Sequence, residues 1–489
     1  MQIFTLPIRR SMFNSIHEEC GVFGIFDSRI SDLASLVYVG LHALQHRGQE
    51  SCGIAVNNDG VFSHYKGDGL VSEVFTPEKL GGIGPGNMAL GHVRYSTTGG
   101  KDINNIQPLV IRHIKGNLAL AHNGNLTNSD EIRRKTELSG GIFHGTSDTE
   151  TIAYSLVDDR LNSANMREAV EKTMGKIQGA YSCVIMTATS MIAFRDPNGF
   201  RPLSIGRMAG GAYCVASESC AFDAVGAKFI RDVRPGEIIE FSKDGMQSFG
   251  KRIGAKEKSS MCIFEFIYFA RPDSVLDGVS VHHARMKAGA LLACEHPVEA
   301  DVVIGVPDSG LDAALGYAKQ SGIPYGIGFI KNKYTGRSFI QPSQLSREDT
   351  VRLKLNVIKE TVRDKRVIMI DDSIVRGTTC ARIVSLLREA GAKEVHVRVS
   401  APPFRHPCYF GTDIDSRDNL IACKYEKTEE IAKAIGADSL GYLSVESTHK
   451  IAEEADVCFC DGCFTGSYPV PVPENHTKNK YDIKIGNFG

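Results

Sequence analysis

The chain has 489 residues, so we expect more than one domain, because domains usually contain about 100–200 residues. Its 56 Lys and Arg residues nearly balance its 57 Asp and Glu residues, and the net charge of −1 argues against a nucleic-acid partner. No apolar run reaches the roughly 18 residues of a membrane-spanning helix, so we expect no membrane partner. The thirteen scattered cysteines, with no secretory signal before them, indicate a reducing, cytoplasmic location.

The beginning of the chain combines a short leader with a candidate nucleophile. Residues 1–19 have neither the continuous apolar core of a signal peptide nor a helical period, and residues 20–26 read as an apolar strand that begins at Cys20. A cysteine at the start of a mature chain can use its own α-amino group as the base during attack. This chemistry requires that residues 1–19 be removed. A cysteine without such a context is more often a buried apolar residue.

Four polar clusters follow Cys20, each at a predicted strand end, turn or helix start. They occupy residues 42–50, 91–97, 120–126 and 145–150. Each has an ordinary explanation as a helix cap, a turn or a surface ion pair. Their occurrence together in one span with Cys20 favours a binding pocket instead.

The residue types in these clusters suit the backbone groups of an amino acid. Arg94, in a predicted strand, can pair with an α-carboxylate through two hydrogen bonds, and Asp148, near the start of a predicted helix, can pair with an α-ammonium. We expect Asn123 and Gly124 to lie in a tight turn, where the amide side chain and the glycine N–H form an oxyanion hole. The sequence thus predicts a site for attack on an amino-acid carbonyl.

The region from 196 to 260 marks the end of the first predicted domain. Residues 196–240 contain short strands and turns, and the basic, polar residues 251–260 indicate a linker. Residues 261–269 are apolar, and we expect them to form the first strand of a second domain.

A strand–loop–helix pattern at residues 367–379 predicts a second ligand site. Its apolar strand ends at Asp371 and Asp372, which suit sugar hydroxyls or a magnesium ion. The hydroxyls and glycine that follow, and the helix N-terminus after them, suit a phosphate. The residues concerned are Ser373, Gly377, Thr378 and Thr379.

Residues 301–310 repeat this pattern, with a strand that ends at Asp308 and Ser309 and a helix from Asp312. In an open α/β sheet both turns face one crevice past the carboxyl ends of the strands. An ordinary helix N-cap would also explain Ser309.

The segment at 367–379 resembles the phosphoribosyl pyrophosphate (PRPP) signature of type I phosphoribosyltransferases, which have a doubly wound α/β fold. The resemblance implies PRPP binding by Asp371, Asp372, Ser373, Arg376, Gly377, Thr378 and Thr379. It also implies that Ser309, Asp371 and Asp372 bind Mg²⁺. The basic segment 331–342 corresponds to a loop that closes over PRPP, so Lys331 and Arg337 are expected to contact the diphosphate. From composition alone it would equally be a solvated surface loop.

The motifs around Cys20 resemble the N-terminal-nucleophile glutamine amidotransferases, whose domain is a layered αββα fold. By this resemblance Cys20 is the nucleophile and Asn123 and Gly124 form the oxyanion hole. The residues implied to bind glutamine are Arg94, Thr97, Asn123, Gly124 and Asp148.

The two resemblances together cover the chain from Cys20 to about Pro469 and match the glutamine PRPP amidotransferase family. They imply a propeptide at 1–19, a glutaminase domain at 20–250, a phosphoribosyltransferase domain at 251–470 and a tail at 471–489. The implied reaction converts glutamine, PRPP and water to 5-phosphoribosylamine, glutamate and pyrophosphate, the first step of de novo purine biosynthesis. The family also implies feedback inhibition by purine nucleotides and a homotetramer.

Two other classes of protein share part of this pattern. Other glutamine amidotransferases share the first domain, but their second domains lack the pattern at 367–379. A regulator that binds PRPP and DNA would lack the pocket around Cys20 and would carry a basic surface.

Four cysteines form a candidate metal set. Only Cys460 and Cys463 have ligand spacing of their own, a weak signal that fits zinc, iron–sulfur or redox use. The family resemblance adds Cys262 and Cys408 and implies a structural [4Fe–4S] cluster on these four. Zinc remains an alternative, since four thiolates satisfy either metal. Cys458 lies close to the pair in sequence but matches no family ligand.

Overall fold

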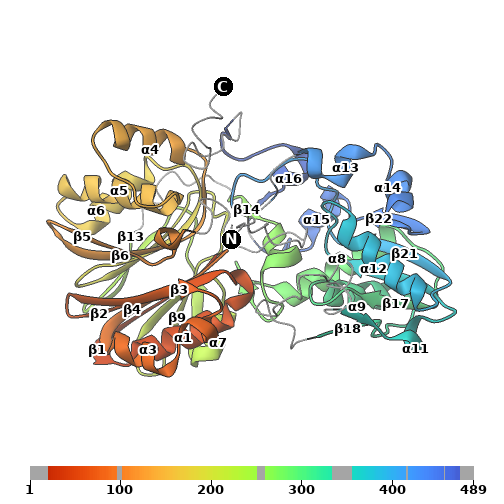
Figure 1. Ribbon diagram of the computed structural model, residues 1–489, viewed down its shortest axis with the longest axis horizontal. Coiled ribbons are helices and arrows are strands. Elements are labelled where there is room, and N and C mark those ends of the chain that lie inside the picture. The colour runs from red at the N-terminus through yellow and green to blue at the C-terminus, as the bar shows by residue number, and fades with distance from the viewer. Residues whose placement is uncertain are drawn as a thin grey trace, which may run out of the picture. The chain divides into compact units, whose positions relative to one another are not determined.

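The computed structural model describes residues 20–95, 102–249, 259–332, 355–412, 414, 417–455 and 457–473. The chain divides into two compact units, which are described separately (Figure 1). Of the described residues, the first contains 20–284 together with Pro407–Ile414 and the segment from Ala452 onwards. The second contains Arg285–His406 and Asp415–Ile451.

The first unit is built on two antiparallel sheets. In the described residues one has seven strands in the order β11-β9-β10-β1-β4-β2-β3, and the other has six in the order β13-β12-β8-β7-β6-β5. The strands of the first sheet are β1 (Gly21–Ser31), β2 (Ser51–Asn58), β3 (Val61–Asp68), β4 (Gly86–Arg94), β9 (Ser204–Met208), β10 (Tyr213–Ala216) and β11 (Ala227–Asp232). Those of the second are β5 (Leu109–His113), β6 (Gly116–Leu126), β7 (Gly179–Met186), β8 (Met191–Arg195), β12 (Ile238–Ser242) and β13 (Gly245–Phe249).

Helices cover the outer faces of the two sheets. One apolar cluster joins inward-facing residues of both sheets, a second joins the seven-stranded sheet to α1, α2, α3 and α7, and a third joins the six-stranded sheet to α5 and α6. The helices are α1 (Leu33–Ala43), α2 (Val71–Val74), α3 (Pro77–Ile83), α4 (Ser129–Leu138), α5 (Asp148–Leu161), α6 (Met166–Met174) and α7 (Cys220–Val225). This layering confirms the predicted αββα fold.

Close packing of α1 on β1 requires a glycine. A Cβ atom at Gly40 would lie 2.7 Å from the Phe23 ring, a separation that no side chain tolerates. Gly40 therefore lets α1 lie directly on the strand that begins one residue after Cys20. Shorter elements complete the unit: η1 (Gln45–Arg47), η2 (Ile103–Asn105), β14 (Met261–Cys262), η3 (Glu265–Phe269), β15 (Val275–Leu276), β16 (Val279–Ser280), β23 (Phe459–Cys460) and α16 (Gly462–Thr465).

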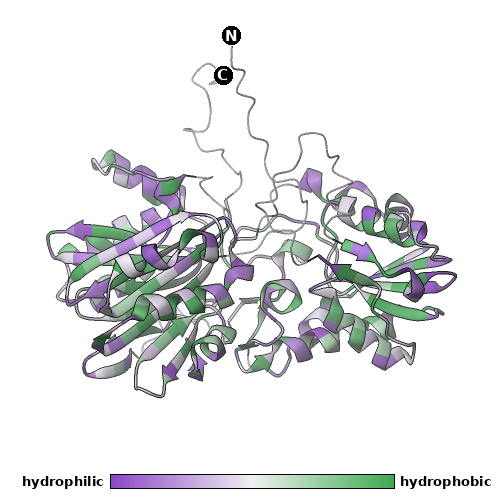
Figure 2. Ribbon diagram, turned by 60° about the horizontal axis from the view of Figure 1, so that its bottom comes forward, coloured by the Kyte–Doolittle hydropathy of each residue, from purple (hydrophilic) through white to green (hydrophobic). Residues whose placement is uncertain are grey.

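The second unit contains a parallel sheet, in which the described strands follow the order β17-β20-β21-β22. They are β17 (Val302–Gly305), β20 (Arg366–Asp371), β21 (Glu394–Val399) and β22 (Ser439–Tyr442), and a two-stranded ribbon joins β18 (Phe329–Lys331) to β19 (Leu355–Val357). The helices are α8 (Val281–Glu295), α9 (Gly310–Ser321), α11 (Lys359–Val362), α12 (Thr378–Glu389), η4 (Arg417–Asn419), α13 (Ile421–Lys424), α14 (Thr428–Ile435) and α15 (Val445–Lys450). Figure 2 shows hydrophobic residues, in green, along these strands. The α/β prediction is confirmed.

Two local predictions are wrong. Residues 261–269 do not form one strand, because only Met261 and Cys262 are extended and Glu265–Phe269 is a π-helix. In this helix the Glu265 side chain is buried and forms ion pairs with Arg47 and Arg201 of the first unit. Asn123 and Gly124 do not form a tight turn, because β6 continues to Leu126 in register with β7.

Candidate active sites

Cys20 lies directly before β1, where the first sheet brings several predicted residues together. Its thiol donates a hydrogen bond to the Tyr95 carbonyl oxygen with a sulfur–oxygen distance of 3.7 Å. Arg47 donates through Nε to the Cys20 carbonyl oxygen at 3.2 Å. The pairing of Gly21 with Val93 and the hydrogen bond to Tyr95 therefore place Cys20 beside the carboxyl end of β4.

Arg94 is the last residue of β4, and its side chain is buried. The loop that leads into β2 passes so close that a Cβ atom at Gly48 would lie 2.6 Å from the Arg94 backbone nitrogen. Gly48, in the polar cluster at residues 42–50, is thus a steric requirement where the chain passes Arg94. Thr97, the other predicted residue of this cluster, lies outside the described residues.

Asn123 is the clearest sign of a binding function in the first unit. Its side chain is fully buried, yet neither its amide oxygen nor its amide nitrogen has a hydrogen-bond partner among the described residues. Burying such groups unsatisfied costs about 1–3 kcal/mol each, so a ligand that pairs with them gains that energy. Gly124 follows with φ +143°, and a Cβ atom there would lie 2.1 Å from the Ala180 carbonyl oxygen. This backbone conformation is available only to glycine.

Asp148 begins α5 and faces the end of β6. One carboxylate oxygen accepts a hydrogen bond from the Leu126 N–H at 2.9 Å, and the other lies 3.7 Å from Nδ1 of His122. Asp148 is therefore held by Leu126, which lies three residues after Asn123 along β6.

Buried polar residues that the sequence reasoning did not assign support this arrangement. His92 donates through Nε2 to the His122 carbonyl oxygen at 3.0 Å, and Gln107 accepts from the His122 N–H at 2.7 Å. Burial lowers the pKa of His92 to about 3, so its imidazole is neutral at pH 7. His92 and His122 lie inside the polar clusters at residues 91–97 and 120–126, and their place there was the available signal.

In the second unit, β20 ends at the acidic pair as predicted. The Ser309 hydroxyl donates to Asp372 at 2.5 Å, and the Ser373 hydroxyl donates to the other oxygen of Asp372 at 2.5 Å. Because β17 and β20 are parallel neighbours, the turns that follow them meet at one edge of the sheet. Ser309, Asp371 and Asp372 are thus brought together.

The electrostatics of this edge favour a cation. Burial, and then the neighbouring Asp372 charge, raises the pKa of the Asp371 carboxyl well above its usual range, and burial raises the pKa of Asp372. A metal ion would offset the cost of keeping both carboxylates ionised. Lys331 Nζ lies 2.5 Å from a carboxylate oxygen of Asp308, next to Ser309, whereas Arg337 lies outside the described residues.

The turn after the acidic pair requires a glycine. α12 begins at Thr378, as predicted, and Gly377 precedes it with φ +82°. A Cβ atom at Gly377 would lie 2.3 Å from Cδ1 of Ile421. Ser373, Arg376 and Thr379 flank this turn, which exposes backbone N–H groups at the start of a helix.

The four candidate metal cysteines all belong to the first unit. Cys262 and Cys460 are opposite each other in the parallel pair β14–β23. Burial, and then the neighbouring thiols of Cys408, Cys262 and Cys460, raises the pKa of Cys463 well above its usual range. The thiols are therefore neighbours, although among the described residues no three Cys, His, Asp or Glu side chains are arranged as ligands to a metal ion.

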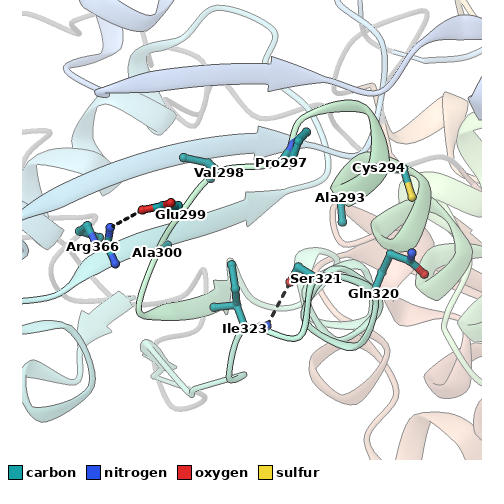
Figure 3. Close-up of a pocket in the computed structure, with 10 residues that line it drawn as sticks. All are labelled: Ala293, Cys294, Pro297, Val298, Glu299, Ala300, Gln320, Ser321, Ile323 and Arg366. Atoms are coloured by element: carbon teal, nitrogen blue, oxygen red, sulfur yellow. Dashed lines mark hydrogen bonds and ion pairs between the residues drawn. The ribbon is translucent and has the colours of Figure 1, made fainter.

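An open pocket of about 810 Å³ lies in the second unit (Figure 3). Arg366, the first residue of β20, lies on one side of it and pairs with Glu299 at 3.4 Å. The pocket is thus at the amino ends of β17 and β20, opposite the acidic pair. Its lining residues are Ala293, Cys294, Pro297, Val298, Glu299, Ala300, Gln320, Ser321, Ile323 and Arg366. Within the described ranges, no helix is both long and apolar enough to cross a membrane.

Comparisons with known proteins identify the two domains. Residues 92–224 match a family model described as a glutamine amidotransferase domain, and residues 285–423 match a phosphoribosyl transferase domain. Amidophosphoribosyltransferase of Bacillus subtilis (strain 168) is 49% identical over 462 residues, which are 94% of this chain and 95% of that protein. Its counterpart in Methanocaldococcus jannaschii is 48% identical over 93% of this chain and 98% of that protein.

Solved structures are also similar to this chain in three dimensions. The B. subtilis glutamine PRPP amidotransferase complexed with ADP and GMP superposes with a TM-score of 0.87 at 48% identity, and it covers 94% of this chain and 99% of that one. A structure described as the allosteric regulatory enzyme of purine biosynthesis gives the same TM-score over 93% of this chain and 97% of that one. On this evidence the chain belongs to the amidophosphoribosyltransferases, the glutamine-dependent pentosyltransferases that use PRPP in purine biosynthesis.

Proposed function

We propose that Cys20, once residues 1–19 are removed, is the nucleophile that releases ammonia from glutamine. The observation that supports this most strongly is the buried Asn123 amide without a partner, in the same unit as Cys20, Arg94 and Asp148. Arg94 holds the α-carboxylate of glutamine and Asp148 its α-ammonium, and Thr97 completes the binding set.

The reaction follows from these positions. The α-amino group of Cys20 takes the thiol proton as the sulfur attacks the carboxamide carbon, and the same proton passes to the departing ammonia. The Asn123 side chain and the Gly124 N–H stabilise the negative oxygen of the tetrahedral intermediate. Water then cleaves the γ-glutamyl thioester and releases glutamate.

The second unit binds PRPP and presents its anomeric carbon to ammonia. The backbone N–H groups around Gly377 and the hydroxyls of Ser373, Thr378 and Thr379 hold the 5′-phosphate, and Arg376 lies beside them. Lys331 and Arg337 neutralise the diphosphate. Ammonia displaces pyrophosphate with inversion and yields 5-phosphoribosylamine.

The acidic edge fits a magnesium ion. Asp371, Asp372 and Ser309 supply oxygen donors, the ligands that this ion prefers, and their contacts place these donors together. When bound, Mg²⁺ neutralises charge on the departing pyrophosphate.

The four neighbouring thiols fit a structural metal centre. We assign a [4Fe–4S] cluster to Cys262, Cys408, Cys460 and Cys463, because four neighbouring thiolates match the ligand set of that cluster. Bound there, the cluster stabilises the fold by joining segments that are distant in sequence.

Further properties follow from the family assignment. The functional domains are expected at 20–250 and 251–470, with a tail at 471–489. The relative with bound ADP and GMP supports purine nucleotides as inhibitors of this chain. A homotetramer and a cytoplasmic location complete the proposal.

Replacement of Cys20 tests whether glutamine cleavage and the use of ammonia occur at separate sites. Cys20→Ala is expected to abolish synthesis from glutamine and to leave synthesis from ammonium salts, because the two reactions use separate sites. Loss of both activities in a folded protein, or retention of both, would overturn the assignment of Cys20.

A further inference from the structure

A buried ion network in the first unit holds the backbone of Cys20. The side chain of Glu265, in the π-helix Glu265–Phe269, is fully buried and accepts two hydrogen bonds from the Arg47 guanidinium, each at 2.9 Å. Arg47 also donates to Glu218 at 2.6 Å and, through Nε, to the Cys20 carbonyl oxygen at 3.2 Å. These contacts engage both edges of the guanidinium and leave it one orientation.

A second arginine shares the Glu265 carboxylate. Arg201 donates to Glu265 at 3.2 Å and donates to the Phe410 carbonyl oxygen at 3.1 and 2.7 Å. The network therefore contains two buried cations and two buried carboxylates, Glu218 and Glu265. Each charge has a partner of opposite sign, as burial requires.

Glu265 reaches this network from beyond the predicted end of the glutaminase domain. The glutamine amidotransferase family model covers residues 92–224, and the predicted glutaminase domain ends at 250. Cys20, in contrast, directly precedes β1, and Arg47 ends η1, which follows α1, so both lie near the start of that predicted domain. The nucleophile is thus held by a side chain that follows the glutaminase sequence in the chain.

We propose that Glu265 is a positioning residue for the glutaminase reaction, which acts through Arg47 to fix the Cys20 backbone. The inference rests on the proposed role of Cys20 as the nucleophile. The α-amino group and the thiol of Cys20 both branch from the carbon next to the carbonyl that Arg47 holds. A rotation of that carbonyl would move both reacting groups relative to bound glutamine.

The size of the effect follows from geometry. Displacement of a reacting group by about 1 Å can lower a rate by about 10²-fold. Glu265 is not one of the groups assigned to hold glutamine, so its loss is expected to lower kcat and to leave KM for glutamine largely unchanged.

The isosteric variant Glu265→Gln tests this with purified full-length enzyme. We expect kcat for glutamine-dependent synthesis to fall by about 10²-fold, with ammonium-dependent synthesis unchanged. Glu237→Gln is the matched control, because Glu237 is also buried and binds both Nη atoms of an arginine, Arg231, at 2.8 and 2.7 Å. Glu237→Gln is expected to retain both activities.

A double-mutant cycle separates positioning from general destabilisation. If Glu265 acts through Arg47, the double variant Glu265→Gln/Arg47→Met loses no more kcat than Arg47→Met alone. Should Glu265→Gln not fold, Glu265→Asp keeps the charge and is expected to show an intermediate kcat with the same KM. Wild-type kcat in Glu265→Gln or Glu265→Asp, equal loss of both activities, or additive losses in the cycle would each overturn the proposal. A Cys20→Ala enzyme that still uses glutamine would instead overturn the proposed function.

Discussion

The Ser309 hydroxyl donates a 2.5 Å hydrogen bond to the Asp372 carboxylate, across 63 positions of sequence. The contact exists because the parallel strands β17 and β20 end side by side. From the sequence alone, the Ser309 hydroxyl would also be explained as an ordinary helix N-cap. In the structure it contacts the acidic pair Asp371 and Asp372, whose carboxyl pKa values are raised by burial. Their shared position is what makes Ser309 a candidate magnesium ligand.

Ser309→Ala is expected to weaken Mg²⁺-dependent PRPP use. Removal of a side chain that hydrogen-bonds a metal-binding carboxylate, as Ser309 does with Asp372, typically lowers metal affinity or activity by about 10–100-fold. Because the defect lies in the PRPP site, synthesis from ammonium and from glutamine is expected to fall together. Magnesium titrations of both reactions measure this. Ser385→Ala, which removes a hydroxyl bonded to Glu389 on α12, is the control; equal magnesium dependence in the two variants would contradict the assignment.

Asn123→Leu is expected to lower kcat for glutamine by about 10²–10³-fold, because one donor to the tetrahedral oxygen is lost. Leucine has a similar size and leaves no unpaired polar atoms, so stability is expected to hold or rise. Steady-state kinetics with glutamine and with ammonium give the comparison. Asn87 is another buried amide, near the start of β4, whereas Arg94 of the proposed glutamine site is at the end of that strand. Asn87→Leu is therefore expected to leave kcat for glutamine at the wild-type value. Similar kinetics in the two variants would exclude Asn123 from the oxyanion hole.

Cys460→Ser is expected to remove the brown colour of the anaerobically purified enzyme and to lower its unfolding temperature. The cluster would tie Cys262, Cys408 and Cys463 to Cys460, so loss of one ligand releases all three segments. Iron and sulfide analysis with thermal unfolding measures both effects. Cys458→Ser, at an exposed thiol two residues away, is expected to keep both. A colourless, zinc-containing and fully active wild-type protein would contradict the iron–sulfur assignment.

The network around Arg47 is expected to make stability depend on acid pH. Burial alone would raise the pKa of Glu218 and Glu265, but His46 and Arg47 lower that of Glu218 overall, and Arg47 and Arg201 lower that of Glu265. A glutamate in an unfolded chain has a pKa of about 4.3. A lowered folded-state pKa gives stability that is complete above this value and is lost as the pH falls below it.

The unfolding temperature of Glu265→Gln is therefore expected to fall less steeply than that of the wild type between about pH 5 and pH 3. Thermal unfolding at a series of pH values gives the two curves. Curves that run parallel would show that Glu265 is not held ionised in the folded protein.

The sequence predicted the secondary structure correctly where a local residue pattern determines it. The apolar run before Asp371 was predicted as a buried strand and Thr378 and Thr379 as the start of a helix, and the structure has β20 and α12 there. The prediction failed where distant contacts decide the backbone. Residues 261–269 are apolar enough for a strand, but Glu265 finds its partners more than 60 positions away, at Arg201 and Arg47. The single acid inside that apolar run was the available signal.

The backbone conformation at Asn123 also depends on contacts that are distant in sequence. A glycine between two asparagines is typical of a turn, yet pairing with β7 keeps Asn123 and Gly124 in a strand, and only the positive φ of Gly124 reflects the local preference. The amides could be predicted as functional from their chemistry, whereas their backbone geometry depends on a strand almost 60 residues later.

Intact mass spectrometry after reaction with an electrophilic analogue of glutamine tests the central claim most directly. The account predicts a chain that begins at Cys20 and carries one adduct, which peptide mapping places on that residue. It also predicts that excess glutamine protects the protein from labelling. A fully glutamine-active enzyme that retains residues 1–19, or an adduct on any other cysteine, would contradict it.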